Sequence, residues 1–339
     1  MIISTFCIGL ILSFTKISWF FGGLSSAIFK KNFGFYLVFD YQTLLEKTCQ
    51  HVEPFSHQGE VATYIPALAE QKKGQFAIAL QTTDGKVYSS GDVSNKFTVQ
   101  SVSKALTLTM ALQRYGDDLW QRVGKEPSGT AFNSLTQLEF EQGKPRNPFI
   151  NAGAIVTADA LYSRLSAPIH AVLEKFRAQS GNSNVVINRT VANSEYQHRY
   201  RNAAMAYLMK SFENFDNDVE KVLWSYFNYC AIEVNVIELA KTFSYLSNKG
   251  LCLQSGKQVL SAKQTKQLNS LLFTSGLYDA AGDFAYRVGM PGKSGVSGTI
   301  IAVLPGQFTA AVWSPGLDSY GNSVAGIAAL EYLAEHINQ

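Results

Sequence analysis

Strand-like patterns of apolar and polar residues lie near both ends of the chain. Residues 75–81 (QFAIALQ) form an apolar run, and residues 86–90 follow an Asp-Gly pair of the kind that closes a β-hairpin. Residues 299–304 (TIIAVL) and 307–314 (QFTAAVWS) are two further apolar runs, joined by a Pro-Gly turn. These spacings predict one hairpin in the first third of the chain and a second hairpin near the C-terminus.

Helical periodicity dominates most of the remaining chain beyond residue 60. It predicts a helix over residues 61–72, a short strand over 97–100 that runs directly into a helix over 101–115, and a closing helix over 321–338. Residues 116–284 favour helices and loops and contain no convincing pair of strands. The helices expected in this middle stretch span residues 154–165, 169–180, 201–212, 218–229, 235–248 and 262–275.

Hairpins at both ends of a helical middle predict an α+β fold, because strands from the two ends can share a sheet that helices then cover. We expect an antiparallel sheet formed from N- and C-terminal segments and flanked by helices, with an all-helical domain inserted between them. In this interpretation residues 40–115 and 285–339 form an α/β sheet domain, and residues 116–284 form the helical domain.

Residues 1–39 form an apolar leader that departs from these patterns. Residues 1–29 carry a single charge, Lys16, and Lys30 and Lys31 follow them. A membrane span needs about 20 apolar residues, and Lys16 divides the run, while a secretory signal needs a positive segment ahead of it. Three interpretations stay open: a mis-called start, a membrane anchor whose flanking lysines keep the remainder on the cytoplasmic side, or a cleaved signal.

The composition indicates a folded globular protein without a strong electrostatic preference. The 339 residues are 46% hydrophobic and 12% aromatic, which excludes a disordered chain. The formal net charge of +3 is too small to argue for a nucleic-acid groove or an anionic membrane surface. The cysteines Cys7, Cys49, Cys230 and Cys252 are widely spaced and offer neither a metal-ligand pair nor a disulfide framework. Such cysteine usage suits the reducing cytoplasm.

Familiar phosphate, nucleophile and metal motifs are incomplete. Gly292-Lys293-Ser294 resembles the end of a P-loop, but Arg287 occupies the position of the required first glycine. Gly295-Val296-Ser297-Gly298 lacks the spacing of a nucleophile elbow. The five histidines are scattered and no H-E-x-x-H sequence occurs, so we expect no metal site.

An S-x-x-K sequence, Ser101-Val102-Ser103-Lys104, begins the helix that follows the predicted short strand. Residues three apart share one helix face, so the Lys104 amine can reach the Ser101 hydroxyl. A serine nucleophile needs a base, and a partly desolvated lysine with a lowered pKa can remove its proton. The helix N-terminus also supplies a backbone N–H where an oxyanion would form.

On its own, this motif is more typical of an N-cap serine followed by a solvated lysine. A second motif changes the interpretation. Lys293-Ser294-Gly295 precedes the strand predicted at 299–304, in the manner of the K-T-G element of serine β-lactamases and penicillin-binding proteins. We expect both motifs to border one sheet, and their combination indicates acyl transfer through a serine.

From about Tyr41 to the C-terminus, the sequence resembles the bacterial-type, serine-dependent glutaminases, a family with a serine β-lactamase-like fold. The long run from residue 126 to residue 154, which ends in PRNPFINAGA at 145–154, is the most specific part of the match. The chain departs from the family where Ser297-Gly298-Thr299 replaces a glycine-rich tract and where residues 228–232 lack a usual serine. The other matching segments are residues 62–69 (ATYIPALA), 97–104 (FTVQSVSK), 126–129, 132–134, 194–195, 201–202, 226–227, 278–279 and 293–296 (KSGV).

The resemblance implies hydrolysis of L-glutamine to L-glutamate and ammonia through a serine acyl-enzyme, with no metal or organic cofactor. It implies that Ser101 is the nucleophile and Lys104 its base, and that Tyr64 and Tyr278 carry the proton toward the leaving ammonia. The backbone N–H groups of Ser101 and Val296 would form the oxyanion hole. The positions matched to substrate binding are Ser101, Asn151, Glu195, Asn202, Tyr226, Tyr278 and Val296.

Two other functions stay open: a penicillin-recognising serine peptidase of the same fold, and a non-catalytic, membrane-anchored binding protein. A peptidase has no evident use for the amino acid clamp of Glu195 and Asn202, and a non-catalytic protein has no need of Ser101 and Lys104 together. The resemblance also implies a cytoplasmic homodimer or homotetramer that acts on a small molecule. We expect no nucleic-acid partner, and a membrane contact only if the leader is real.

Overall fold

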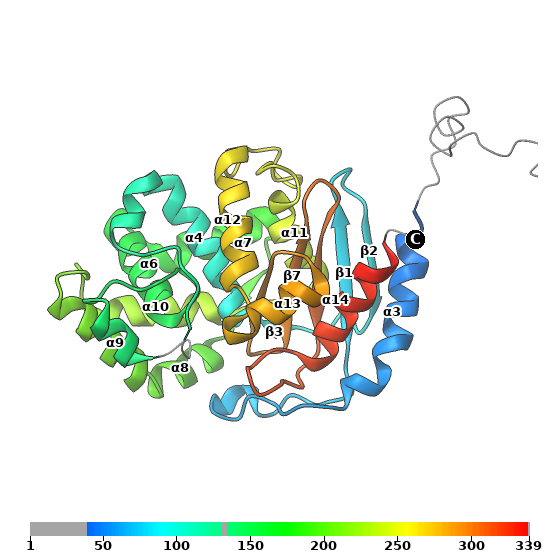
Figure 1. Cartoon of the computed structure of the whole chain (residues 1–339), viewed down its shortest axis with the longest axis horizontal. Helices are drawn as coiled ribbons and strands as arrows, with labels where there is room; N and C mark the ends of the chain where they lie inside the picture. The colour runs from blue at the N-terminus through cyan, green and yellow to red at the C-terminus, as the bar shows by residue number, and fades with distance from the viewer. Residues whose placement is uncertain (1–38, 130–133, 338–339) are drawn as a thin grey trace, which may run out of the picture. The chain divides into compact units, whose positions relative to one another are not determined.

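The computed structural model describes residues 39–129 and 134–337 of the chain (Figure 1). The apolar leader, apart from its last residue Phe39, lies outside the described residues, and so does the pair Phe132-Asn133. Within the described ranges, no helix combines the length and the apolar character that a membrane crossing requires. The three interpretations of the leader therefore stay predictions.

Five antiparallel strands form the main sheet, and they come from two distant parts of the chain. In sheet order they are β2 (Val87–Gly91), β1 (Ala77–Thr82), β8 (Phe308–Trp313), β7 (Thr299–Leu304) and β6 (Gly292–Gly295). β1 pairs with β8, with Ala79 opposite Ala311, so the two predicted hairpins join side by side. Both hairpins and the antiparallel α+β architecture are thereby confirmed.

Helices cover the sheet on both faces. α3 (Tyr41–Ser56) packs on β1 and β2, α14 (Val324–His336) packs on β7 and β8, and these two helices contact each other along their lengths (Figure 1). α11 (Val236–Phe243) also packs on β1, β7 and β8. Because both faces are covered, every residue of β1 and β8 is buried, which explains their continuous apolar runs.

Between the two halves of the sheet, most helices lie where the periodicity predicts them. α4 (Ser103–Tyr115) is buried from Ser103 through Leu112 and packs against α6. The short helices α5, α8 and α13 were not predicted, since few turns produce a weak periodicity. The N-terminal α3 was not predicted either. The remaining helices are α5 (Leu135–Phe140), α6 (Asn151–Arg164), α7 (Pro168–Ser180), α8 (Arg189–Gln197), α9 (Tyr200–Ser211), α10 (Val219–Cys230), α12 (Ala262–Ser275) and α13 (Ala281–Val288), with 3₁₀ turns at η3 (Gln100–Val102), η4 (Gly116–Gln121), η5 (Ser244–Leu246) and η6 (Tyr278–Ala280).

A second sheet of three short strands contradicts two expectations. β3 (Phe97–Thr98) pairs with β5 (Ile232–Val234), which in turn pairs with β4 (Val186–Ile187). The strand expected over residues 97–100 is thus shorter and lies outside the main sheet, and residues 116–284 are not all-helical. Runs of two or three residues carry no measurable periodicity, so their pairing depends on tertiary contacts.

The helix expected over residues 61–72 is absent. Within that stretch only Pro66–Leu68 (η2) is helical, as one 3₁₀ turn flanked by turns and irregular chain. A proline restricts the residue before it to extended conformations, and Ile65 accordingly has φ −112° and ψ 98°. Pro66 therefore begins a short helix at its own position and prevents a longer one from passing through.

Candidate functional site

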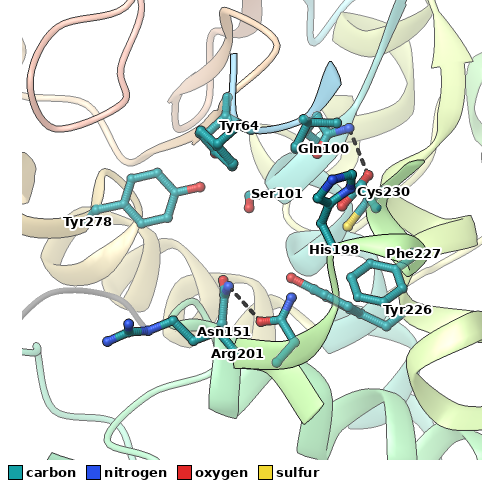
Figure 2. Close-up of a pocket in the computed structure, with 14 residues that line it drawn as sticks. Tyr64, Gln100, Ser101, Asn151, His198, Arg201, Tyr226, Phe227, Cys230 and Tyr278 are labelled. Atoms are coloured by element: carbon teal, nitrogen blue, oxygen red, sulfur yellow. Dashed lines mark hydrogen bonds between the residues drawn. The ribbon is translucent and has the colours of Figure 1, made fainter. Parts of the chain in front are cut away.

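A cavity of 320 Å³ lies where the turn before α4 meets α6, α8, α9 and α10 (Figure 2). It brings together eight of the nine side chains or backbone groups proposed from the sequence. The ninth, Lys104, is buried and touches the cavity wall through a hydrogen bond to Asn151. The eight that line the cavity are Tyr64, Ser101, Asn151, Glu195, Asn202, Tyr226, Tyr278 and Val296.

Ser101 lies in the 3₁₀ turn η3, between β3 and α4. The helix that was predicted to begin at Ser101 begins at Ser103 instead. The preceding Gln100 has φ +46°, a left-handed conformation that costs energy for a residue with a side chain. Its amide supports the turn, because Nε2 donates to Thr98 Oγ1 at 3.2 Å and to Glu195 Oε1 at 3.0 Å. The strained turn places Ser101 at the cavity wall, where it is 9% exposed.

Lys104 is fully buried one turn after Ser101. Its Nζ donates to the backbone oxygen of Phe149 at 3.0 Å and to Asn151 Oδ1 at 2.8 Å. Burial lowers the pKa of Lys104 to about 8, since desolvation disfavours the ammonium form. This direction agrees with the expectation for a partly desolvated lysine, and a neutral amine is accessible near Ser101 at mildly alkaline pH.

Tyr278 lies beside the proposed nucleophile, and its hydroxyl points toward Ser101 in Figure 2. A hydrogen bond from the Ser101 side chain lowers the pKa of Tyr278, but burial outweighs it and raises that pKa above its usual value. Tyr278 also has a left-handed backbone, with φ +53°, at the start of η6. Both Ser101 and Tyr278 are therefore held by unfavourable local backbone conformations, as at many functional sites.

Lys293 also lies near Ser101 and Tyr278, but it belongs to the main sheet. It lies in β6, whereas Ser101 follows β3 of the small sheet, so the expectation that both motifs border one sheet is wrong. The motifs meet because β6 contacts η3 in the tertiary structure. Lys293 Nζ donates to the backbone oxygens of Gly276 and Ser294, each at 2.8 Å, and burial lowers the pKa of Lys293 well below its usual value.

Glu195 faces the cavity from α8. Burial raises the pKa of its carboxyl to about 8, while the hydrogen bond from Gln100 and the charge of Lys104 act in the opposite direction. A buried carboxylate is stable only with a partner of opposite charge. Glu195 therefore suits a ligand that brings an ammonium group into the cavity.

Amide and hydroxyl groups line the remaining wall. Asn151, the first residue of α6, donates from Nδ2 to Asn202 Oδ1 at 3.1 Å, so the two amides hold each other in place. Tyr226 is 5% exposed on α10, and burial raises its pKa, so its hydroxyl stays a neutral hydrogen-bond donor. Such groups can donate to the carboxylate and carbonyl oxygens of a small polar ligand.

Three residues of the cavity wall differ in how far their side chains are exposed to solvent. Tyr64 is 60% exposed and lies at the edge of the cavity, in contrast to Tyr278, which is 8% exposed. Val296 follows β6 directly and lines the cavity with little exposure. The geometry thus separates the two tyrosines into a solvent-facing one and an enclosed one.

The sequence analysis missed several residues that line the cavity. Helical spacing could have indicated two of them, because His198 follows Glu195 by three positions and Cys230 follows Tyr226 by four. Cys230 is buried with its Sγ 3.8 Å from Ser103 Oγ, and burial raises the pKa of its thiol. The lining residues not predicted are Ile65, Gln100, His198, Arg201, Phe227 and Cys230.

Comparison with known proteins gives consistent matches along the chain. A family model described as Glutaminase matches residues 59–339. A glutaminase of Pseudoalteromonas translucida (strain TAC 125) is 69% identical over 299 residues, which cover 88% of this chain and 97% of that protein. A glutaminase of Vibrio atlanticus (strain LGP32) is 58% identical over 88% of this chain and 98% of its own length.

Solved structures agree with these matches. The structure of a protein described as the probable glutaminase ybaS superimposes with a TM-score of 0.82 at 34% identity, covering 88% of this chain and 98% of that one. A probable glutaminase of Bacillus subtilis superimposes with a TM-score of 0.79 at 30% identity, over 88% and 96% of the two chains. The similarity thus extends over nearly all of the described residues.

Proposed function

Because the chain belongs to the glutaminase family and hydrolyses glutamine to glutamate and ammonia, we propose that the cavity at Ser101 is its active site. The observation that carries this proposal is the convergence of Ser101, Lys104 and Tyr278 beside a cavity whose far side holds Glu195. The α+β architecture is the β-lactamase-like fold of the family. The matches favour this function over a penicillin-recognising peptidase or a non-catalytic binding protein.

In the acylation step, Ser101 Oγ attacks the side-chain amide carbon of glutamine. Lys104, directly or through Tyr278, accepts the Ser101 proton, since a pKa of about 8 leaves part of the lysine neutral. The C–N bond then breaks, and the proton passes to the nitrogen that leaves as ammonia. Water attacks the resulting ester in a second step, which releases glutamate and restores the Ser101 hydroxyl.

Backbone groups stabilise the charge that develops on the carbonyl oxygen. The N–H groups of Ser101 and Val296 come from η3 and the end of β6, two elements in contact. Two such donors at a fixed position form an oxyanion hole that needs no reorganisation during the reaction. Tyr64, at the cavity edge, assists the proton transfer to the leaving ammonia from the solvent side.

The amino acid end of glutamine binds at the opposite side of the cavity. Glu195 accepts from the α-ammonium group, which compensates the buried carboxylate. Asn151, Asn202 and Tyr226 donate to the α-carboxylate, while Tyr278 and Ser101 lie at the amide end. A site that hydrogen-bonds both ends rejects analogues that lack either group, because its own polar atoms would be left unpaired.

The experiment that tests the proposal measures ammonia and glutamate release from L-glutamine by the full chain and by two serine variants. Ser101→Ala is expected to abolish both products. Ser103→Ala is the matched control, because Ser103 is buried on the same segment but does not line the cavity. Full activity in Ser101→Ala would remove Ser101 from the mechanism.

We also propose the domain division, assembly and location that the sequence suggested. Residues 40–115 and 285–339 form the sheet domain and residues 116–284 the inserted domain, which includes β4 and β5. The protein assembles as a homodimer or homotetramer in the cytoplasm. Light scattering on the purified full chain and fractionation of the source cells test the last two points.

A further inference from the structure

A second cavity, of 670 Å³, lies beside the substrate cavity and is separate from it. Helices α8 and α10 form the wall between the two: Glu195 and Tyr226 line the substrate cavity, whereas their neighbours Tyr196 and Ser225 line the second. No residue of the described chain lines both. A ligand in the second cavity would therefore not occupy the glutamine site.

The walls of the second cavity are largely aromatic and aliphatic. Tyr162 on α6, Tyr196 on α8 and Trp224 on α10 are each partly exposed there. The rings of Tyr196 and Trp224 meet edge to face, with centroids 5.4 Å apart, so each helps to hold the other in place. The aliphatic lining consists of Ile169, Leu173 and Ile187. Surfaces of this kind suit a flat, apolar ligand group.

The charged groups at this cavity are predominantly positive. Arg189 and Lys221 are exposed and line it, and within the described residues no carboxylate pairs with either of them. Among the described residues that line this cavity, Glu220 is the one acid. It is already compensated, since its Oε2 accepts from Arg199 Nε at 2.6 Å and from the Tyr196 hydroxyl at 2.8 Å.

Arg189 is also well placed to orient an anion. One of its guanidinium nitrogens, Nη1, donates to Asn228 Oδ1 at 2.6 Å, which fixes the side chain and leaves further N–H donors. Asn228 is itself held, because its Nδ2 donates to the backbone oxygen of Trp224 at 2.7 Å. A fixed guanidinium can bind a carboxylate or phosphate through two parallel hydrogen bonds.

We propose that this cavity is a second ligand site that binds a small aromatic anion. The ring lies against Trp224 and Tyr162, and the carboxylate or phosphate lies between Arg189 and Lys221. Apolar burial of the ring supplies affinity, and the two cations select anionic over neutral ligands.

Isothermal titration calorimetry on the full chain tests this proposal with three probes: 1-naphthylacetate, adenosine monophosphate and the neutral 1-naphthylacetamide. We expect at least one anion to bind, at least tenfold more tightly than the neutral amide, with the same affinity when L-glutamate saturates the active site. Whichever anion binds identifies the preferred group as carboxylate or phosphate. Binding of neither anion, or displacement by glutamate, would overturn the proposal.

A charge-reversal variant locates the site. Lys221→Glu is expected to weaken binding of the anion about tenfold, since it replaces an attraction by a repulsion at the rim. Lys221 is exposed, so the variant does not threaten folding, and glutamine hydrolysis should be unchanged. Lys263→Glu on α12 is the matched control, because Lys263 is also exposed and does not line this cavity. Equal affinity in wild type and Lys221→Glu would contradict the proposed position.

Discussion

The Nζ atom of Lys293 lies 4.2 Å from the ring centroid of Tyr278, and that of Lys104 lies 5.8 Å from the same centroid. Burial raises the pKa of Tyr278 above its usual value, and the hydrogen bond with the Ser101 side chain opposes that rise. Tyr278 is therefore protonated before the reaction begins. It can accept a proton from one neighbouring group only while it donates its own proton to another. This property suits a relay between the nucleophile and the leaving group.

Replacing Lys293 with methionine tests the contribution of the nearer amine. The variant keeps much of the side-chain volume but removes the amine beside Tyr278 and its hydrogen bonds to the backbone oxygens of Gly276 and Ser294. We expect kcat to fall about 100-fold, in the range of other acid–base contributions, with KM changed less than threefold. Steady-state kinetics with Lys293→Arg as the control that retains a hydrogen-bond donor measures this effect, and a kcat within twofold of wild type would exclude the role.

The pH dependence of kcat reports the protonation of Lys104. Its pKa is about 8, and the proposed base must be neutral, so kcat should rise with pH through that value. Asn151→Asp places a carboxylate where Asn151 Oδ1 lies, 2.8 Å from Lys104 Nζ, and should raise the lysine pKa. We expect the rising limb of the profile to move upward by at least about one pH unit. An unmoved limb at saturating glutamine would argue against Lys104 as the titrating group.

Glu195 links substrate binding to stability. In the folded chain its pKa is about 8, above the ordinary value of 4.5, so folding favours its protonated form. Wild-type stability should therefore decrease as the pH rises from about 4.5 to about 8, because the folded state binds the extra proton there. Glu195→Gln cannot ionise and avoids this loss.

The expected result for Glu195→Gln is a melting temperature close to wild type at pH 5 and several degrees higher at pH 8.5, with kcat/KM reduced at least about 100-fold. Scanning calorimetry at the two pH values and glutamine kinetics provide the measurements. Glu335→Gln, an exposed carboxylate on α14, is the control and should show neither effect. A difference in melting temperature that is the same at both pH values would contradict the prediction.

Replacement of two helical glycines by alanine should change the free energy of unfolding in opposite directions. A Cβ at Gly153 of α6 would lie 1.9 Å from the backbone oxygen of Asn147, whereas a Cβ at Gly282 of α13 has nothing within 4 Å. Gly153→Ala should therefore lower the free energy of unfolding by about 3 kcal/mol or more. Gly282→Ala should raise it by about 0.5–1 kcal/mol, because alanine is the better helix former. Urea titration of both variants checks the contrast, which equal shifts would disprove.

Fold prediction succeeded where a local pattern was long enough. The hairpin of β7 with β8 carries a turn between two apolar runs, and that of β1 with β2 an Asp-Gly turn after one. A helix such as α12 has several turns of periodicity. The three short strands of the small sheet do not, and the prediction missed β4 and β5. At residues 61–72 the apolar spacing favoured a helix, but the restriction that Pro66 imposes on Ile65 prevailed.

Site prediction depended on different kinds of information for different residues. The S-x-x-K spacing together with the Lys293-Ser294-Gly295 motif indicated Ser101 and Lys104, and the resemblance to glutaminases supplied Asn151, Glu195 and the tyrosines. Neither source showed that Lys293 approaches Tyr278 from another sheet. Gln100 was also missed, although it contacts Glu195 across 95 positions of sequence.

The sequence by itself determined which functional groups are present and which local elements carry them, because turn chemistry, periodicity and motif spacing act over a few residues. Only the tertiary structure decided which groups meet, how deeply each is buried and hence how far each pKa moves. Lys104 and Glu195 each have pKa values of about 8 because the surrounding chain removes them from water, and no local pattern encodes that removal. The second cavity likewise exists only because α6, α7, α8 and α10 converge after folding.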